Sequence, residues 1–263
     1  GSYIRISGTQ HMEAVSSMPD WLAQMLHNLI LTGQCTDITL ELNDSLMTKV
    51  LDSGTVSTSP DFVLTGTCTT SFQTSGANRS NNIVVGASRL NNLIVMPGQT
   101  VSVSDTILPR TRANGYKEAG VYVNGAHTTG LGGGVCQISS TVYNAVKNAG
   151  LTILQRNPHS MPVSYLPKGL DAAIAAGSKD LKFRNDYTTP VVLYTDTSNK
   201  HLTVNVLVWN QELAGRSFKL WAKQTGALSA DTYFTTYQNG KEVSTQFVGT
   251  SRYNPYREAV NDD

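Results

Sequence analysis

The residue with the clearest capacity for chemistry is Cys136, which follows the run Gly132-Gly133-Gly134 and precedes a helical pattern. A thiol attacks as a thiolate, and the unpaired N–H groups at a helix N-terminus favour that negative charge. Glycines let the backbone approach a substrate carbonyl, so the N–H groups of Gly133 and Gly134 could form an oxyanion hole. The pattern indicates an acyl-transfer nucleophile, and the alternative is a structural cysteine buried behind a glycine-rich turn.

A cysteine nucleophile needs a general base, and two of the five histidines are candidates. His159 lies between Pro158 and Pro162, whose restricted backbone would hold the imidazole in place. His127 stands shortly before the glycine run and is the second candidate. The remaining histidines have the sequence settings of surface residues: His11, His27 and His201. The residues alone leave the choice between His159 and His127 open.

The base in turn needs an orienting group, for which Asp171 and Asp180 are candidates, although either could be a plain turn residue. Arg79 could hold a substrate carboxylate through paired hydrogen bonds, and a surface or helix-capping arginine is an equal alternative. The sequence has no Cys-x-x-Cys and no histidine pair at helical spacing, so we expect no metal and no cofactor. A phosphate-binding loop is excluded because no lysine follows the glycines.

The elements that must position these residues follow from periodicity and turn signals. The apolar stripe from Ile138 to Ala149 predicts a helix that ends at Gly150. Earlier patterns predict a helix over 80–92, a strand–turn–strand over 93–103 and a hairpin at 124–125. Later strands are expected at 180–184, 190–195 and 201–209, with a last hairpin over 231–247. The expected fold class is α+β, mainly an antiparallel sheet with the nucleophile-bearing helix and a few flanking helices.

The first 60 residues carry a smaller pattern, with strands at 3–9 and 38–42 and an amphipathic helix at 19–31.

Charged residues make up 15% of the 263 residues and the formal net charge is +1, which offers no field for nucleic acid or an anionic membrane. Abundant Ser, Thr and Gly favour a β-rich extracellular protein. Three cysteines leave two arrangements open: a disulfide between Cys35 and Cys68, or three free thiols.

At this point the residues resemble a known family. The run from Gly132 to Ser139, followed by Tyr143-Asn144-Ala145, is similar to the core motif of VanW-like domains. The flanking matches span about residues 68–210 and are Asn78-Arg79, Pro97-Gly98, His159-Ser160, Gly169-Leu170-Asp171-Ala172 and Asp180-Leu181-Lys182-Phe183. An ordered set of this length is far more specific than any one motif.

The resemblance implies an L,D-transpeptidase that cross-links peptidoglycan. Cys136 would attack the carbonyl between the third and fourth residues of a stem tetrapeptide, expel D-Ala, and pass the acyl group from a thioester to an amine of a second stem. The family's His-Ser motif makes His159 the base, with Asp171 as its orienter. The oxyanion and substrate contacts carried over are Gly133, Gly134, Arg79, Ser160 and Tyr165.

The resemblance also divides the chain. Residues 1–60 resemble part of a peptidoglycan-binding α/β domain, 61–210 the VanW-like catalytic domain, and 211–263 a β-rich C-terminal extension. We expect peptidoglycan stem peptides and no nucleic acid as partners. The expected location is the extracellular face of a Gram-positive envelope, with a membrane anchor in a region absent from this chain. A thiol-dependent peptidoglycan hydrolase and a non-catalytic wall-binding module remain the alternatives.

Overall fold

The computed structural model describes residues 2–7, 11–12, 37–42, 62–123, 126–175 and 177–255, without side-chain detail up to residue 62 and over 122–127. Near the N-terminus, β1 (Ser2–Ser7) lies between β2 (His11–Met12) and β3 (Asp37–Leu42) in an antiparallel sheet. The two strands predicted there are confirmed within the described residues. The predicted helix at 19–31 lies outside them, as does Cys35.

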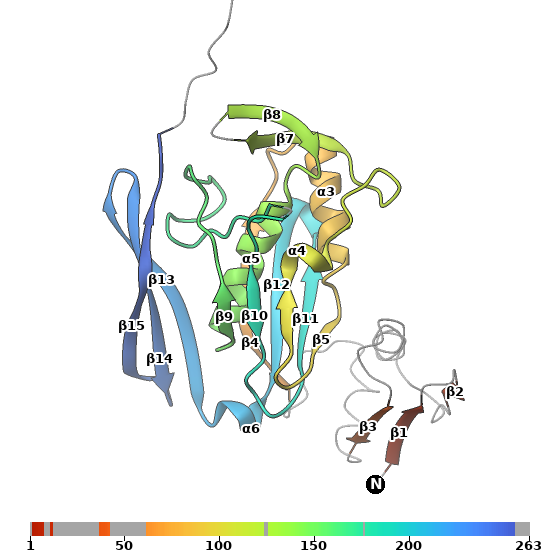
Figure 1. Cartoon of the computed structure of the whole chain (residues 1–263). Helices are drawn as coiled ribbons and strands as arrows, with labels where there is room; N and C mark the ends of the chain where they lie inside the picture. Colours follow the sequence, from red (N-terminus) through yellow and green to blue (C-terminus); the bar gives the residue numbers. More distant parts are fainter. Residues whose placement is uncertain are drawn as a thin grey trace, which may run out of the picture.

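A four-stranded antiparallel sheet forms the centre of the molecule (Figure 1). Its strands, in spatial order, are β4 (Phe62–Ser71), β12 (His201–Trp209), β11 (Val191–Asp196) and β5 (Leu93–Val95). Two helices pack on this layer, α3 (Ala77–Ser88) and α5 (Val135–Asn148). The buried aliphatic side chains of β12 and α5 make up much of the core between them.

The helix α5 is the element that carries Cys136. It begins at Val135, three residues before the predicted start, because the buried Val135 extends the apolar stripe toward the glycines. Its contact with the sheet is close: a Cβ on Gly66 of β4 would lie 2.0 Å from the Ala145 carbonyl oxygen. The predicted stop is confirmed, since Gly150 follows the helix with φ +82°.

Two smaller antiparallel units flank this core. One is a sheet in the order β6 (Thr100–Ser102), β10 (Lys182–Arg184) and β9 (Thr152–Gln155). The other is the predicted hairpin of β7 (Glu118–Val123) and β8 (Ala126–Leu131). The strand–turn–strand predicted over 93–103 is confirmed. Its two strands, β5 and β6, join different sheets, and Val103 begins the short helix α4 (Val103–Thr106).

The C-terminal part of the chain forms a further three-stranded sheet, which packs against α5 (Figure 1). After the short turns η1 (Ser198–Lys200) and α6 (Asn210–Leu213) come β13 (Arg216–Gly226), β14 (Ser229–Gln238) and β15 (Lys241–Arg252). The predicted last hairpin is confirmed as β14 and β15, joined at Asn239 and Gly240. The strand β13 was not predicted, because most of its residues are exposed and it lacks an alternating apolar pattern.

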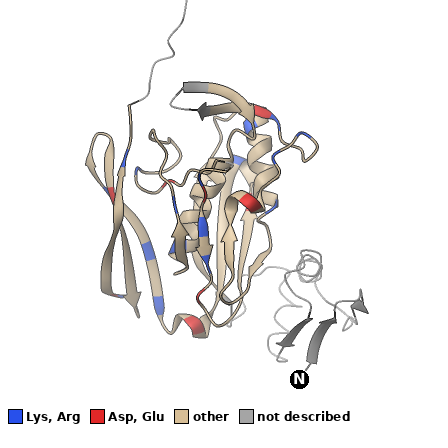
Figure 2. Cartoon of the chain, viewed as in Figure 1, with Lys and Arg blue, Asp and Glu red and all other residues tan. Residues whose placement is uncertain are grey.

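The α+β class is confirmed, and every strand pair in the described ranges is antiparallel. Charged residues are scattered over the described surface without a large patch of one sign (Figure 2). None of the described helices combines the length and apolar character that a bilayer span requires.

Candidate active site

Cys136 lies in the first turn of α5 and is half-buried, with its Sγ 3.3 Å from the Ile174 carbonyl oxygen. Two backbone amides of this turn already have acceptors: Val135 donates to Gly132 O at 3.3 Å, and Gln137 donates to Gly134 O at 3.0 Å. In the described part of the chain the Cys136 amide has no such acceptor, as expected for a residue at a helix start. The nucleophile's own N–H is therefore a donor available to a developing oxyanion.

The glycines before Cys136 are required by close packing, a reason that the sequence did not suggest. A Cβ on Gly133 would lie 2.6 Å from the Gly120 carbonyl oxygen of β7. Gly134 has φ +112°, and a Cβ there would lie 3.0 Å from Cγ of Arg79. The side chain of Asn82 in α3 donates to Gly133 O at 3.0 Å and fixes the turn. The glycines therefore set where the N-terminus of α5 lies.

Replacing Gly134 with alanine is expected to destabilise the fold by about 1–3 kcal/mol, because it adds backbone strain and a contact with Arg79. Gly98→Ala is the matched control: Gly98 has φ +74° but no atom within 4 Å of an added Cβ, so it adds strain alone. Urea unfolding of both variants measures the difference. A Gly134→Ala cost no larger than that of Gly98→Ala would contradict this packing argument.

His159 and Asp171 form the pair expected beside a nucleophilic cysteine. The ring Nδ1 of His159 lies 2.7 Å from Asp171 Oδ2, and the His159 backbone N–H donates to the same oxygen at 2.7 Å. This arrangement leaves Nε2 as the ring nitrogen that can interact with Cys136, and the imidazole and the thiol shift each other's pKa. The imidazole is 19% exposed, whereas the Asp171 side chain is 1% exposed. Cys136, His159 and Asp171 thus form one connected chain of contacts.

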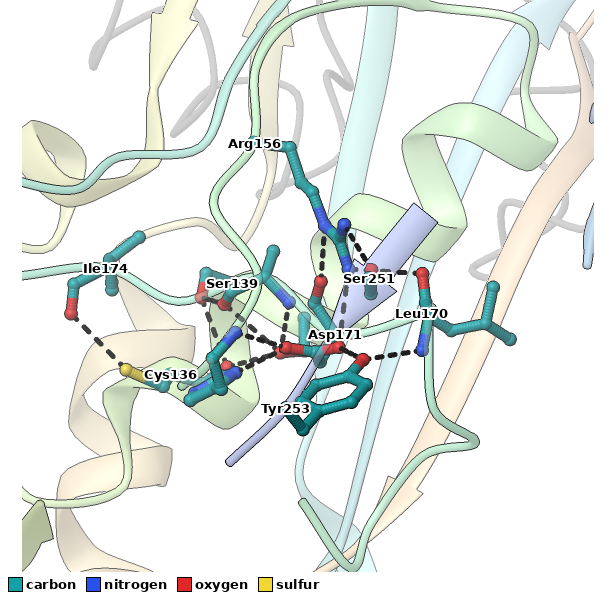
Figure 3. A network of polar contacts seen from close by, with 12 residues as sticks. Cys136, Ser139, Arg156, Leu170, Asp171, Ile174, Ser251 and Tyr253 are labelled. Atoms are coloured by element: carbon teal, nitrogen blue, oxygen red, sulfur yellow. Dashed lines mark hydrogen bonds and ion pairs between the residues drawn. The ribbon is translucent and has the colours of Figure 1, made fainter. Parts of the chain in front are cut away.

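The buried carboxylate of Asp171 has enough donors to stay ionised. Its Oδ1 accepts from the Tyr253 hydroxyl at 2.5 Å and from Arg156 at 3.3 Å (Figure 3). Burial alone would raise the pKa of Asp171, but the bonds from His159, Tyr253 and Arg156 outweigh burial and lower this pKa to about 2. Asp171 is therefore an anion at neutral pH.

The thiol and the imidazole stabilise each other's charged forms. Burial alone would raise the pKa of Cys136, but the hydrogen bond and charge of His159 outweigh burial, and the nearby Arg110 adds to them, so this pKa is lowered. Burial alone would lower the pKa of His159, but Asp171 and Cys136 outweigh burial and raise this pKa to about 9. These shifts favour a thiolate–imidazolium pair over a neutral thiol and a neutral imidazole.

The polar face of α5 positions the segment that carries Asp171. Ser139 donates to Ala172 O at 2.5 Å, and Ser140 accepts from the Ala172 N–H at 2.9 Å. One turn later, Asn144 donates to Leu170 O at 2.7 Å. These three side chains are buried, so they align the backbone on both sides of Asp171 with the helix that holds Cys136.

The other site residues predicted from the sequence lie in different environments in the structure. Asp180 accepts from Ser102 and the Ser104 N–H at the start of α4, so it does not contact His159. The side chain of His127 lies outside the described residues. Burial raises the pKa of Tyr165 and the charge of the nearby Cys136 adds to this shift, while the tyrosine hydroxyl lies 3.4 Å from Ser140 Oγ. Ser160 is exposed beside His159.

Arg79 uses its guanidinium for hydrogen bonds to other side chains beside the site. Its guanidinium donates to Ser75 Oγ at 2.5 Å and to Gln137 Oε1 at 2.9 Å, and Gln137 in turn donates to Ser71 O at 2.9 Å. These bonds tie α3, α5 and the end of β4 together next to the nucleophile. Two of the donors that the sequence analysis assigned to a substrate are therefore used within the protein.

Two residues near the site were missed in the sequence. Arg110 lies against the glycine turn, since a Cβ on Gly132 would be 3.0 Å from Cδ of Arg110, and its charge reaches the Cys136 thiol. Tyr253 comes from the last described residues of the chain and bonds Asp171. Neither residue had a local signal: Arg110 lies in a loop, and Tyr253 lies within the C-terminal extension without a motif around it. Within the described residues, no group of three or more His, Cys, Asp or Glu side chains could hold a metal ion.

The comparisons with known proteins cover the region that contains this site. The model of the family described as "VanW like protein" matches residues 78–207. The chain is 42% identical over 128 residues to "Uncharacterized protein YoaR" of Bacillus subtilis (strain 168), which covers 49% of this chain and 42% of that protein. It is 37% identical over 114 residues to "Vancomycin B-type resistance protein VanW" of Enterococcus faecalis (strain ATCC 700802 / V583), which covers 41% of this chain and 42% of that protein. The chain thus spans less than half the length of these curated relatives, and no solved structure matches it.

Proposed function

The chain belongs to the VanW-like family through residues 78–207, and from this premise we propose that it is a cysteine acyltransferase of peptidoglycan, an L,D-transpeptidase. Family membership supports a role associated with peptidoglycan, because one relative is named for vancomycin resistance. The observation that carries the finer proposal is the connected set of Cys136, His159 and Asp171 at the start of α5.

The proposed reaction has two halves that share one thioester. The Cys136 thiolate attacks the carbonyl between the third and fourth stem residues, and the oxyanion that forms accepts from the Cys136 N–H. The C–N bond breaks, the His159 imidazolium gives its proton to the departing D-alanine amine, and the thioester remains. An amine of a second stem then attacks this thioester, His159 takes the amine's proton, and the thiolate leaves.

Arg110 is the side chain that we assign to the donor's terminal carboxylate. Arg79 already donates to Ser75 and Gln137, whereas the guanidinium of Arg110 has no hydrogen-bond acceptor in the described part of the chain. Its position against Gly132, close enough to Cys136 to affect the thiol, suits a carboxylate one residue beyond the reacting carbonyl. The loop is anchored on both sides of Arg110, because Arg89 donates to Leu108 O and Asn114 to Pro109 O.

Arg110→Gln is therefore expected to raise KM for a tetrapeptide donor about tenfold, with a smaller change in kcat, because a charge-assisted contact is lost. Steady-state kinetics with the tetrapeptide, and with the same donor amidated at its C-terminus, measure the effect. The matched control is Arg112→Gln, since Arg112 is an exposed residue of the same loop that pairs with Glu118. An unchanged KM in Arg110→Gln would contradict the assignment.

The substrates and location follow from the same proposal. The donor and acceptor are peptidoglycan stem peptides, so the protein would act on the extracellular face of the envelope, with an anchor in a part of the protein that this chain does not include.

Incubation with a disaccharide tetrapeptide, followed by mass spectrometry of the products, tests the proposal. Transfer gives a cross-linked dimer that has lost one D-alanine. Free D-alanine together with monomeric tripeptide would replace the transferase by a hydrolase. No conversion by the folded and reduced protein would leave a non-catalytic wall-binding module and overturn the proposal.

A further inference from the structure

The C-terminal sheet reaches back into the site described above. Tyr253 directly follows β15, and its side chain is buried at 6% exposure. Its hydroxyl donates to Asp171 Oδ1 at 2.5 Å and accepts from the Gly169 N–H at 2.6 Å, so both roles of the phenol oxygen are used (Figure 3). The Tyr253 N–H donates to Leu228 O at 2.8 Å, which fixes the ring to the sheet.

Further contacts from this sheet hold the segment that carries His159 and Asp171. Arg156 donates to Ser251 Oγ at 2.9 Å as well as to Asp171 (Figure 3). The Asn254 N–H donates to Ser160 O, the residue after His159, at 2.7 Å. The Thr232 hydroxyl of β14 donates to Gly169 O at 2.9 Å. The segment is therefore held by α5 and by the sheet together.

We propose that Tyr253 is a positioning residue for the His159–Asp171 pair, so that β13–β15 complete the active site although they lie outside the family match at 78–207. Its importance for turnover rests on the proposed function, whereas its effect on the thiol does not. The Asp171 carboxylate is almost fully buried, and a buried anion needs donors on each oxygen. His159 supplies donors to Oδ2, while Tyr253 and Arg156 supply them to Oδ1.

The raised pKa of Tyr253 keeps its hydroxyl protonated, so the hydroxyl can donate to Asp171. Burial and the neighbouring Asp171 raise the pKa of Tyr253 to about 12, so the hydroxyl keeps its proton throughout the working pH range. Its loss raises the pKa of Asp171, because one of the bonds that lower this pKa disappears. Protonation of Asp171 then removes the anion that holds the imidazolium, and the Cys136 thiolate loses its counterion at a higher pH than in the wild type.

The test is the pH dependence of Cys136 alkylation by iodoacetamide in the full chain, with the modified peptide identified by mass spectrometry. Tyr253→Phe removes one hydroxyl and keeps the ring. We expect the acid limb of its profile to lie about one pH unit higher than in the wild type, as for loss of one hydrogen bond to a charged group. Tyr187→Phe is the matched control, because its hydroxyl likewise donates one hydrogen bond, to Ala149 O at the opposite end of α5.

A shift in Tyr253→Phe with an unchanged profile in Tyr187→Phe supports the inference. Profiles of Tyr253→Phe and wild type that superimpose would overturn it, as would an equal shift in Tyr187→Phe. If Tyr253→Phe does not fold, Ser251→Ala removes a hydroxyl that contacts both Arg156 and Tyr253, and it should shift the limb in the same direction. Alkylation needs no peptide substrate, so failure of the transfer assay with a shifted limb would remove the proposed function and leave this inference intact.

Discussion

Replacing Cys136 with alanine is expected to abolish peptide transfer, with a loss of about ten-thousand-fold or more. The thiolate is the only protein group in the proposed reaction that forms a covalent bond to the acyl group, and alanine leaves nothing to replace it. The fold should persist, because the side chain is half-buried and alanine is favourable in a helix. Release of D-alanine and formation of the cross-linked dimer measure the loss, and thermal unfolding verifies the fold.

Cys68→Ala provides the matched control for this loss. Cys68 is also a free cysteine and lies in β4, but burial raises its pKa to about 12, so it remains a thiol at neutral pH. Transfer activity should therefore survive this change. Retained activity in Cys136→Ala, or an equal loss in Cys68→Ala, would show that the nucleophile has been assigned incorrectly.

Replacing His159 with glutamine is expected to lower kcat by about a hundred- to ten-thousand-fold, because the change removes both the counterion of the thiolate and the proton donor for the leaving amine. The pH profile of this variant's activity should also lack the alkaline limb of the wild type. The pKa of His159 is raised from 6.5 to about 9, so the imidazolium is present below pH 9 and wild-type activity should fall as the pH rises through 9. Kinetics of both proteins between pH 6 and 10 measure the effect.

The raised pKa of His159 also determines how the stability of the fold depends on pH. Because the folded-state pKa of His159 is raised, its contribution to the free energy of unfolding is fully present below pH 6.5 and is lost as the pH rises through about 9. His201→Gln is the control for the kinetics, since His201 is half-buried on β12 and its ring bonds the Asn199 carbonyl oxygen, away from Cys136. A wild-type alkaline limb that persists in His159→Gln would exclude His159 as the group that titrates there.

The position of Cys136 could be predicted because its signals are local. A glycine run followed by a 3.6-residue apolar period defines a helix start, and the thiol falls in the first turn. The α+β class followed in the same way from turn residues and alternating strands. The start of α5 was placed too late because Val135 alone does not establish a period, and it is buried by packing that the sequence does not display.

The choice of partners for Cys136 depended on tertiary contacts. Asp171 and Asp180 both lie in irregular segments. The packing of α5 and the C-terminal sheet on residues 169–172 brings Asp171 to His159, while Asp180 accepts from the first turn of α4. Tyr253 lies 82 residues from Asp171 and has no motif of its own. The glycines illustrate a different limit: their positions were predictable, but the close approach of β7 and Arg79 that requires them was not.

Intact-protein mass spectrometry during a single turnover with a tetrapeptide stem can detect the proposed thioester on Cys136 itself. The account predicts that the protein gains the mass of the donor minus D-alanine, that the adduct maps to Cys136, and that an acceptor amine removes it. An unmodified protein at a time when D-alanine has already been released, or an adduct on any residue other than Cys136, would contradict the account.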